Sequence, residues 1–239
     1  MRRVFLADVH LTPRDPARTE RLVRFLRREA PRADEIYILG DLFDYWIGPK
    51  HLRLRGYGEA FEALAKAARA AKVFFLLGNR DFYMSRGFEE ATGIRVVPER
   101  TRHRLTAGAQ RVCLCHGDYL EGRTDLGFRV QEWIRSPGFE KAFIRLPAFL
   151  AKAMAEFYRW LSARKGRRRV RLNEEVVVAE FRSGADVIVC GHVHEPARRV
   201  MQVDGRQAVL FTMGDWSAGE SYVVEEDGRW ELCGGPCGG

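Results

Sequence analysis

The segment VFLADVH, residues 4–10, places an aspartate and a histidine directly after a short apolar run. Apolar runs of this length that are rich in Val, Ile and Phe are typical of buried β-strands. The same arrangement occurs five more times, and each run ends in a polar signature of its own. These signatures are Gly40-Asp41, Gly78-Asn79-Arg80-Asp81, His116-Gly117-Asp118, Gly191-His192-Val193-His194 and Gly214-Asp215-Trp216.

Helical patterns separate several of the predicted strands. Apolar residues recur at helical spacing over residues 18–29 and 59–71. Two late hairpins are expected, because Asp204-Gly205 and Asp227-Gly228 are the dipeptides that two-residue turns prefer. Strands that alternate with helices indicate a layered α/β fold.

One long segment lacks the strand pattern. From Asp125 to Leu172 the apolar residues suit helices instead, including a long helix from Pro147 to about Lys165. We therefore expect residues 125–172 to form a helical cap that is inserted into a core made of residues 1–124 and 173–232. The core should resume with Asn173 as the N-cap of a helix that runs to Arg182. Residues 233–239 resemble a flexible Gly-rich tail.

The composition indicates a soluble chain with anionic partners. Of its 239 residues, 46% are hydrophobic, and the formal net charge is +8. The odd number of cysteines, five, without a framework spacing argues against a disulfide scaffold and favours the cytoplasm. We expect no signal peptide, since the first apolar run stops at Asp8, and no stretch approaches the roughly 20 apolar residues that a membrane span needs. Nucleic acid is not expected as a partner, and the sequence does not indicate an oligomeric state.

The polar signatures all follow predicted strands, where ligands gather in open α/β sheets. Side chains two apart on an extended segment point the same way, which pairs the aspartate with the histidine in residues 8–10 and the two histidines in residues 192–194. Seven candidate metal ligands should therefore converge: Asp8, His10, Asp41, Asn79, His116, His192 and His194. His51 and His103 belong to no signature, and we expect them on the surface.

The chemistry of these ligands suits a pair of divalent cations. Carboxylate, imidazole and amide oxygen favour Mn²⁺, Fe, Zn²⁺ or Mg²⁺ and exclude a thiolate site. Seven side chains exceed the needs of one ion, whereas two ions about 3.5–4 Å apart with one bridging carboxylate would use them all. Such a pair clamps a phosphoryl oxygen and generates hydroxide from water at neutral pH. Each signature alone occurs by chance, but the five signatures that supply candidate ligands are hard to explain otherwise when all of them occur in this order.

Residues 4–216 resemble the calcineurin-like metallophosphoesterases, because D-x-H, G-D, G-N-x-D, H-G-D and G-H-x-H occur in that order. The resemblance implies an α-β-β-α sandwich. It also implies that Asp8, His10 and His194 hold the first metal, that Asn79, His116 and His192 hold the second, and that Asp41 bridges them. Most members have histidine at the position of Arg80. Arginine cannot act as a general acid but can hold phosphate oxygens, which favours a phosphoanhydride substrate with a stable leaving group.

Three further segments narrow the resemblance: GNRDF (78–82), ILGDLFDYWIG (38–48) and FRVQEWIRSPGFEKAFIRLPAFL (128–150). They are similar to the UDP-2,3-diacylglucosamine pyrophosphatases of lipid A biosynthesis, which release UMP and 2,3-diacylglucosamine 1-phosphate. That family implies two divalent ions, most often Mn²⁺, a cap that holds acyl chains, and peripheral attachment to the cytoplasmic face of the inner membrane. The implied substrate contacts are Asn79, Arg80, Asp125, Ser162, Arg169 and His192. The chain departs from the family pattern at Phe128, Gly166, Arg169 and Glu195.

Two other functions remain open at this point. A related hydrolase of a soluble nucleotide or another phosphodiester would need no acyl pocket, and the positive charge also leaves room for a nuclease. A non-enzymatic scaffold with this fold is disfavoured, because all seven candidate ligands are present.

Overall fold

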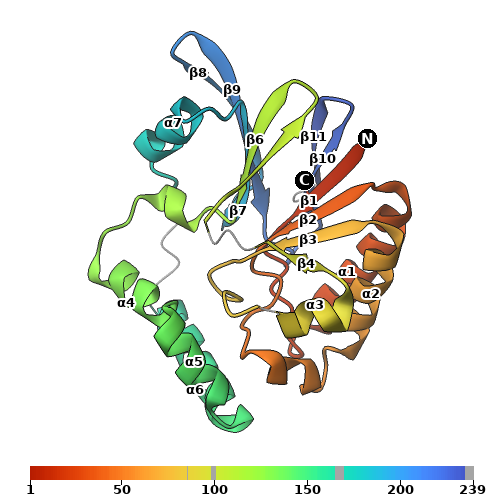
Figure 1. The fold of residues 1–239 in the computed structure, drawn as a ribbon, viewed down its shortest axis with the longest axis vertical. Coiled ribbons are helices and arrows are strands. Elements are labelled where there is room, and N and C mark those ends of the chain that lie inside the picture. Colours follow the sequence, from red (N-terminus) through yellow and green to blue (C-terminus); the bar gives the residue numbers. More distant parts are fainter. Residues whose placement is uncertain (85, 98–100, 165–169, 235–239) are drawn as a thin grey trace.

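The computed structural model describes residues 1–84, 86–97, 101–164 and 170–234, and it contains two β-sheets (Figure 1). The first has the order β11-β10-β1-β2-β3-β4, with β1 to β4 parallel and β10 antiparallel to β1. The second has the order β5-β6-β7-β9-β8, with β6, β7 and β9 parallel. The strands of the first sheet are β1 (Arg2–Leu6), β2 (Glu35–Leu39), β3 (Lys72–Leu76), β4 (Arg95–Val96), β10 (Ser221–Glu226) and β11 (Arg229–Gly234). Those of the second are β5 (His103–Ala107), β6 (Gln110–Cys115), β7 (Val187–His194), β8 (Ala197–Val203) and β9 (Arg206–Gly214).

Helices cover the outer face of each sheet, as Figure 1 shows. The first sheet is covered by α1 (Pro16–Glu29), α2 (Gly58–Ala70) and α3 (Arg86–Thr92), and the second by α7 (Glu174–Arg182). Short 3-10 helices η1 (Ala30–Arg32), η2 (Pro49–Arg53) and η3 (Asp118–Glu121) lie in the connections. As predicted, Asn173 caps α7, because its side chain accepts hydrogen bonds from the backbone N–H groups of Glu175 and Val176. Both predicted hairpins also form, through β8–β9 and β10–β11.

Three apolar layers hold the sandwich together, because the strands alternate their side chains between two faces. Along β1, Val4 and Leu6 pack against the helices of the first sheet, whereas Phe5 points to the second sheet. The layer between the sheets joins Phe5 to partners such as Phe211. A third layer packs Phe181 of α7 on the second sheet. The α-β-β-α sandwich that the sequence predicts is therefore confirmed.

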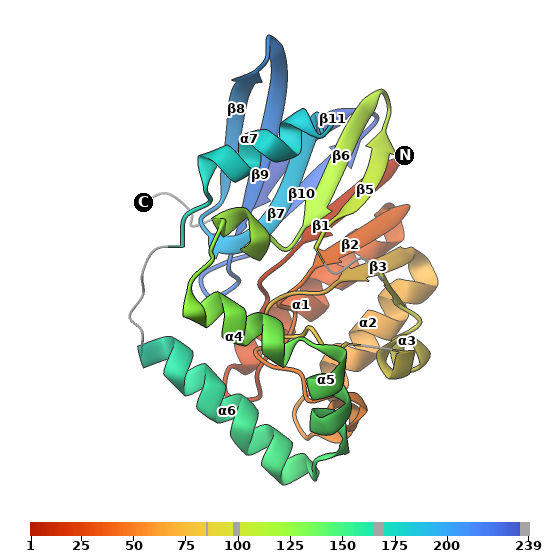
Figure 2. The same cartoon turned by 60° about the vertical axis from the view of Figure 1, so that its left-hand side comes forward.

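Residues 126–164 form three helices that lie beyond the strand ends (Figure 2): α4 (Leu126–Ile134), α5 (Pro137–Arg145) and α6 (Ala148–Arg164). We call these helices the cap. Ion pairs join the cap to the core, with Arg135 2.8 Å from Asp118 and Arg14 3.1 Å from Glu156. At the other end of the chain, the composition suggested a flexible tail that begins at Cys233. The structure instead continues β11 through Gly234, so Cys233 belongs to a strand. Residues 235–239 lie outside the described residues.

His51 is not on the surface, and that expectation was wrong. His51 belongs to η2 and packs among aromatic side chains, and its exposed fraction is 0%. Its ring stacks on Trp46 with 4.5 Å between centroids and lies 4.5 Å from Tyr57. Neither ring nitrogen has a hydrogen-bond partner among the described residues, and burial lowers the pKa of His51 to about 3. The imidazole therefore serves as a neutral aromatic ring in the core.

The buried His51 should make the fold sensitive to acid. In the unfolded chain its imidazole gains a proton below about pH 6.5, whereas in the folded protein it stays neutral down to about pH 3. Stability is therefore lost as the pH falls from 6.5 towards 3, by about 2 kcal/mol at pH 5. His51→Leu removes this contribution, and all other titrating groups cancel in the comparison.

Urea unfolding of both proteins at pH 8 and at pH 5 measures this effect. When the pH is lowered from 8 to 5, the free energy of unfolding should fall by about 2 kcal/mol less in His51→Leu than in the wild type. An identical loss of stability in both proteins would contradict the role given to His51.

Candidate metal centre

Five of the candidate ligands have a left-handed backbone, which residues other than glycine rarely adopt. The φ angles are 55° at Asp8, 51° at His10, 51° at Asp41, 71° at His192 and 58° at His194. Among the described residues, the other non-glycine cases are Asp204 and Asp227, both in hairpin turns. Strained backbone that gathers in one place typically marks a functional site.

Backbone hydrogen bonds between the loops hold this strained conformation in place. The N–H of Asp8 donates to the carbonyl of Gly40 at 3.2 Å, and that of His10 donates to the carbonyl of Asp41 at 2.9 Å. The two sheets are joined as well, because the N–H of His192 donates to the Asp8 carboxylate at 2.7 Å. The loops after β1 and β2 and the end of β7 therefore form one interlocked unit.

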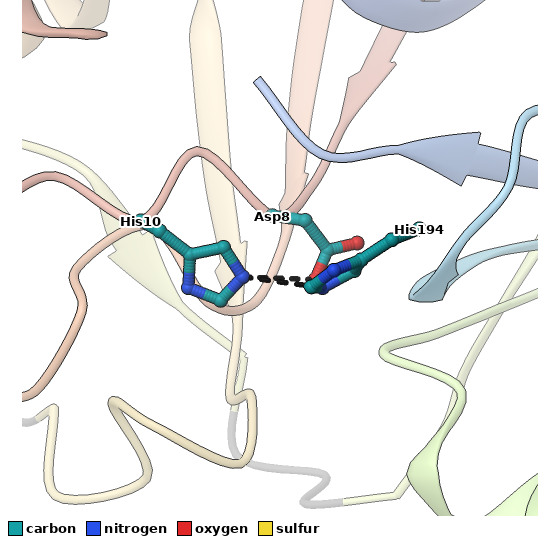
Figure 3. A group of neighbouring side chains, drawn as sticks. All are labelled: Asp8, His10 and His194. Atoms are coloured by element: carbon teal, nitrogen blue, oxygen red, sulfur yellow. Dashed lines mark hydrogen bonds and ion pairs between the residues drawn. The ribbon is translucent and has the colours of Figure 1, made fainter. Parts of the chain in front are cut away.

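One group of candidate ligands comprises Asp8, His10 and His194 (Figure 3). The Nε2 atoms of the two histidines are 3.2 Å apart, and Oδ1 of Asp8 lies 3.4 Å from Nε2 of His194 and 3.8 Å from Nε2 of His10. Oδ1 of Asp8 is buried, and no group in the described part of the chain forms a hydrogen bond with it. Three ligand atoms that face one another in this way could hold a divalent cation.

The second group lies on the other side of the two carboxylates. Nε2 of His116 is 3.6 Å from Oδ1 of Asp41 and 3.2 Å from Nδ1 of His192. The amide nitrogen of Asn79 lies 3.2 Å from the same Nδ1 atom, and its buried Oδ1 has no hydrogen-bond partner within the ranges that the structure describes. Nδ1 of His116 is 2.9 Å from the carbonyl oxygen of Leu39, to which it must donate, so the neutral imidazole has its lone pair on Nε2. This group also suits a cation.

Two carboxylates connect the groups. Oδ2 of Asp41 lies 4.0 Å from His10 and its Oδ1 faces His116, so its two oxygens point to different groups. Asp8 is close enough to both groups to contribute to either. The structure thus brings all seven predicted ligands together, with Asp8 and Asp41 each within reach of both groups.

Buried groups of opposite charge face one another in this site. Burial works against ionisation of Asp8, but the close contact with the His194 imidazole and the charge of His116 hold its pKa well below the usual range. Burial also opposes protonation of His116, yet Asp41 and Asp8 raise its pKa to about 9. A divalent cation would replace that proton as the partner of the two carboxylates, because ligand imidazoles must be neutral. The donor set and its unpartnered atoms therefore fit two cations.

Two glycines leave room for the carboxylates. A side chain at Gly191 would overlap with Oδ2 of Asp8, and one at Gly78 would overlap with Oδ1 of Asp41. The glycines of the G-H-x-H and G-N-x-D signatures are therefore required by close packing against the candidate ligands.

Two residues near the ligands were missed from the sequence. The buried carboxylate of Asp81 accepts hydrogen bonds from the backbone N–H groups of Gly78, Asp41, Leu42 and Phe43, and so fixes the loops of both signatures. Its position as the fourth residue of the GNRD signature could have indicated that Asp81 belongs to the site. Glu121, which contacts Nε2 of His192, belongs to no signature.

Arg80 lies between the ligands and an adjacent cavity. Its side chain is 3.9 Å from Asp41 and 3.7 Å from Asp44. The cavity measures about 470 Å³ and is mainly apolar. The core side of its wall includes Tyr45, Trp46, Asn79, Arg80, Phe82 and Tyr83, and the cap side includes Val130, Trp133, Phe139, Phe143, Met154, Ala155 and Tyr158.

The remaining predicted contacts lie in or near the cap. Asp125 caps α4 and pairs with Arg123 at 2.9 Å, and Phe128 lies in the first turn of that helix. Ser162 lies on α6, but its side chain is outside the described residues, as are Gly166 and Arg169. Glu195 follows β7, and its carbonyl accepts a hydrogen bond from Thr212.

Comparisons with known proteins agree with this geometry. The family described as calcineurin-like phosphoesterase matches residues 1–196. The chain is 34% identical to the UDP-2,3-diacylglucosamine hydrolase of Xanthomonas campestris pv. campestris (strain B100), over 95% of this chain and 97% of that protein. It is 33% identical to the enzyme of the same name from Stenotrophomonas maltophilia (strain K279a), over 97% and 98% of the two chains.

Among solved structures, a dimetal phosphatase from Danio rerio has a similar fold, with a TM-score of 0.52 and 14% identity over 97% of this chain and 95% of that one. A family match over most of the chain, together with buried Asp and His groups that could hold metal ions, identifies the class of protein. The chain belongs to the calcineurin-like phosphoesterase family and is a metal-dependent hydrolase.

Proposed function

We propose that this protein hydrolyses the pyrophosphate bond of UDP-2,3-diacylglucosamine, releasing UMP and 2,3-diacylglucosamine 1-phosphate. The observation that carries the proposal is the apolar cavity that opens beside Arg80 and Asn79. A phosphate-binding arginine at one end and apolar walls elsewhere suit a substrate that joins a pyrophosphate to acyl chains. Curated relatives that match nearly the whole chain carry the name of this activity.

The cap is part of the same proposal. Residues 125–172 would act as a substrate cap on a core made of residues 1–124 and 173–232. Aromatic side chains from α4, α5 and α6 supply one wall of the cavity, so the acyl chains would lie between cap and core. Asp125, Ser162 and Arg169 would contact the substrate from the cap side.

The reaction would depend on positioning and charge more than on proton donation. Two divalent cations, in this proposal Mn²⁺, would polarise the phosphoryl oxygens and lower the pKa of a water molecule. Asp8, His10, Asp41, Asn79, His116, His192 and His194 would hold these ions. Arg80, with Asn79 next to it in the chain, would bind the phosphate oxygens and stabilise the charge that develops on them. Arg80 supplies no proton, which a phosphate leaving group does not require.

The outer surface of the cap suits attachment to a membrane. No helix among the described residues is long and apolar enough to cross a bilayer. Several large apolar side chains of the cap that do not line the cavity are nevertheless exposed, namely Leu126, Phe149, Leu150 and Trp160. Exposed apolar side chains beside basic ones such as Arg145 and Lys152 favour peripheral binding to an anionic lipid surface. We propose that the protein binds the cytoplasmic face of the inner membrane in this way.

The substrate can be tested by UMP release in the presence of Mn²⁺. UDP-2,3-diacylglucosamine should be hydrolysed, whereas UDP-N-acetylglucosamine at equal concentration should not, because it leaves the cavity unfilled. Ala155→Trp, which would fill the cavity from α6, should reduce turnover of the diacyl substrate at least about tenfold. Ala153→Trp on the exposed side of the same helix is the matched control. Equal turnover of both substrates, or none of the diacyl substrate, would instead favour a soluble phosphodiester.

The role of Arg80 can be tested separately. Arg80→Ala should lower kcat about 100-fold or more, because a donor to the developing charge is lost, while the bound metal content stays unchanged. Arg80→Lys should recover only part of the rate, since lysine keeps the charge but not the planar fork. Arg69→Ala, on the exposed surface of α2, is the control. Wild-type kcat in Arg80→Ala would exclude this mechanism.

A further inference from the structure

The carboxylate of Glu121 contacts the imidazole of His192 on the side away from the other candidate ligands. Oε1 of Glu121 lies within hydrogen-bond distance of Nε2 of His192. Only 14% of the Glu121 side chain and 8% of the His192 side chain is exposed. Water therefore competes little for this contact.

The opposite nitrogen of His192 faces the ligand cluster. Nδ1 lies 3.2 Å from Nε2 of His116 and 3.2 Å from the amide nitrogen of Asn79. The backbone of His192 is fixed as well, because its N–H donates to Asp8. Nδ1 is therefore the atom of His192 that is placed to bind a cation.

The contact with Glu121 decides which nitrogen can do so. An ionised carboxylate only accepts hydrogen bonds, so Nε2 of His192 must carry the proton. A neutral imidazole with its proton on Nε2 has its lone pair on Nδ1, which points at the cluster. His116 obtains its tautomer from the backbone carbonyl of Leu39, whereas His192 depends on a side chain.

Glu121 is itself held in place. It ends η3, and the backbone turns immediately afterwards at Gly122, with φ of 64°. The N–H of Asn173 donates to the carbonyl of Leu120 at 2.8 Å, which ties this turn to the start of α7. Arg123 lies 3.7 Å from Oε2 of Glu121 and offsets its charge.

We infer that Glu121 is a positioning residue for the second cation: it holds the proton of His192 on Nε2 and so presents Nδ1 to the ion. The inference rests on the proposed role of His192 as a ligand. Carboxylates that accept the second N–H of a ligand histidine typically strengthen metal binding 10- to 100-fold.

The tautomer can be measured without metal or substrate. Long-range ¹⁵N–¹H NMR spectra of the metal-free wild type at pH 8, assigned with a His192→Gln variant, should show a proton on Nε2 of His192 and none on Nδ1. A proton on Nδ1 would overturn the inference. Loss of the proposed hydrolytic activity would leave this result unchanged, so the two proposals fail separately.

Mn²⁺ binding by equilibrium dialysis is the second readout. Glu121→Leu should weaken the binding of one of the two ions about 10- to 100-fold and leave the binding of the other unchanged. Glu121→Gln should lose less affinity for that ion, because its amide oxygen still accepts a hydrogen bond from Nε2 of His192. Glu226→Leu removes the same charge at an exposed position of β10 and should bind both ions normally. A loss of Mn²⁺ affinity below tenfold in Glu121→Leu would refute the inference. If Glu121→Leu does not fold, the Mn²⁺ affinity of Glu121→Gln and the tautomer of His192 in the wild type provide the test instead.

Discussion

Two buried carboxylates, Asp8 and Asp41, sit between four imidazoles at the junction of the two sheets, and the rest of the molecule supports that arrangement. Acidic groups this close repel one another in a low dielectric unless positive charge lies between them. Protons supply part of that charge on His116, whose pKa rises to about 9. Divalent cations would supply it more completely, which explains why the chain can keep so many ionisable groups out of water.

The sandwich meets this constraint by placing strained loops on rigid strands. Left-handed residues at the ends of β1, β2 and β7 turn the ligand side chains toward one point, and backbone hydrogen bonds between the loops keep them there. Gly78 and Gly191 allow the chains to pass close to the carboxylates. The cap adds what the metal centre lacks, namely an apolar cavity next to Arg80. In the proposed function, the core supplies the chemistry and the cap supplies the selectivity.

Much of this could be predicted from the sequence, because strands that end in polar signatures carry both fold and site information. The sandwich, the Asn173 cap and both Asp-Gly hairpins formed as expected. His51 could not be placed, because nothing in its local sequence reveals that η2 folds beneath Trp46. Glu121 was missed for a similar reason: its contact with His192 joins residues 71 positions apart and follows no motif. Contacts of this kind depend on how loops pack and not on periodicity.

The most direct test of the central claim is the number of metal ions bound per chain in the wild type and in Gly191→Ala. The wild type should bind two Mn²⁺ ions, measured by elemental analysis after dialysis. The added methyl group should displace the Asp8 carboxylate and remove at least one ion. Gly58→Ala, at the start of α2 where an added methyl group meets none of the described residues within 4 Å, should keep both ions. A single ion in the wild type, or two in Gly191→Ala, would contradict a dinuclear centre built around Asp8.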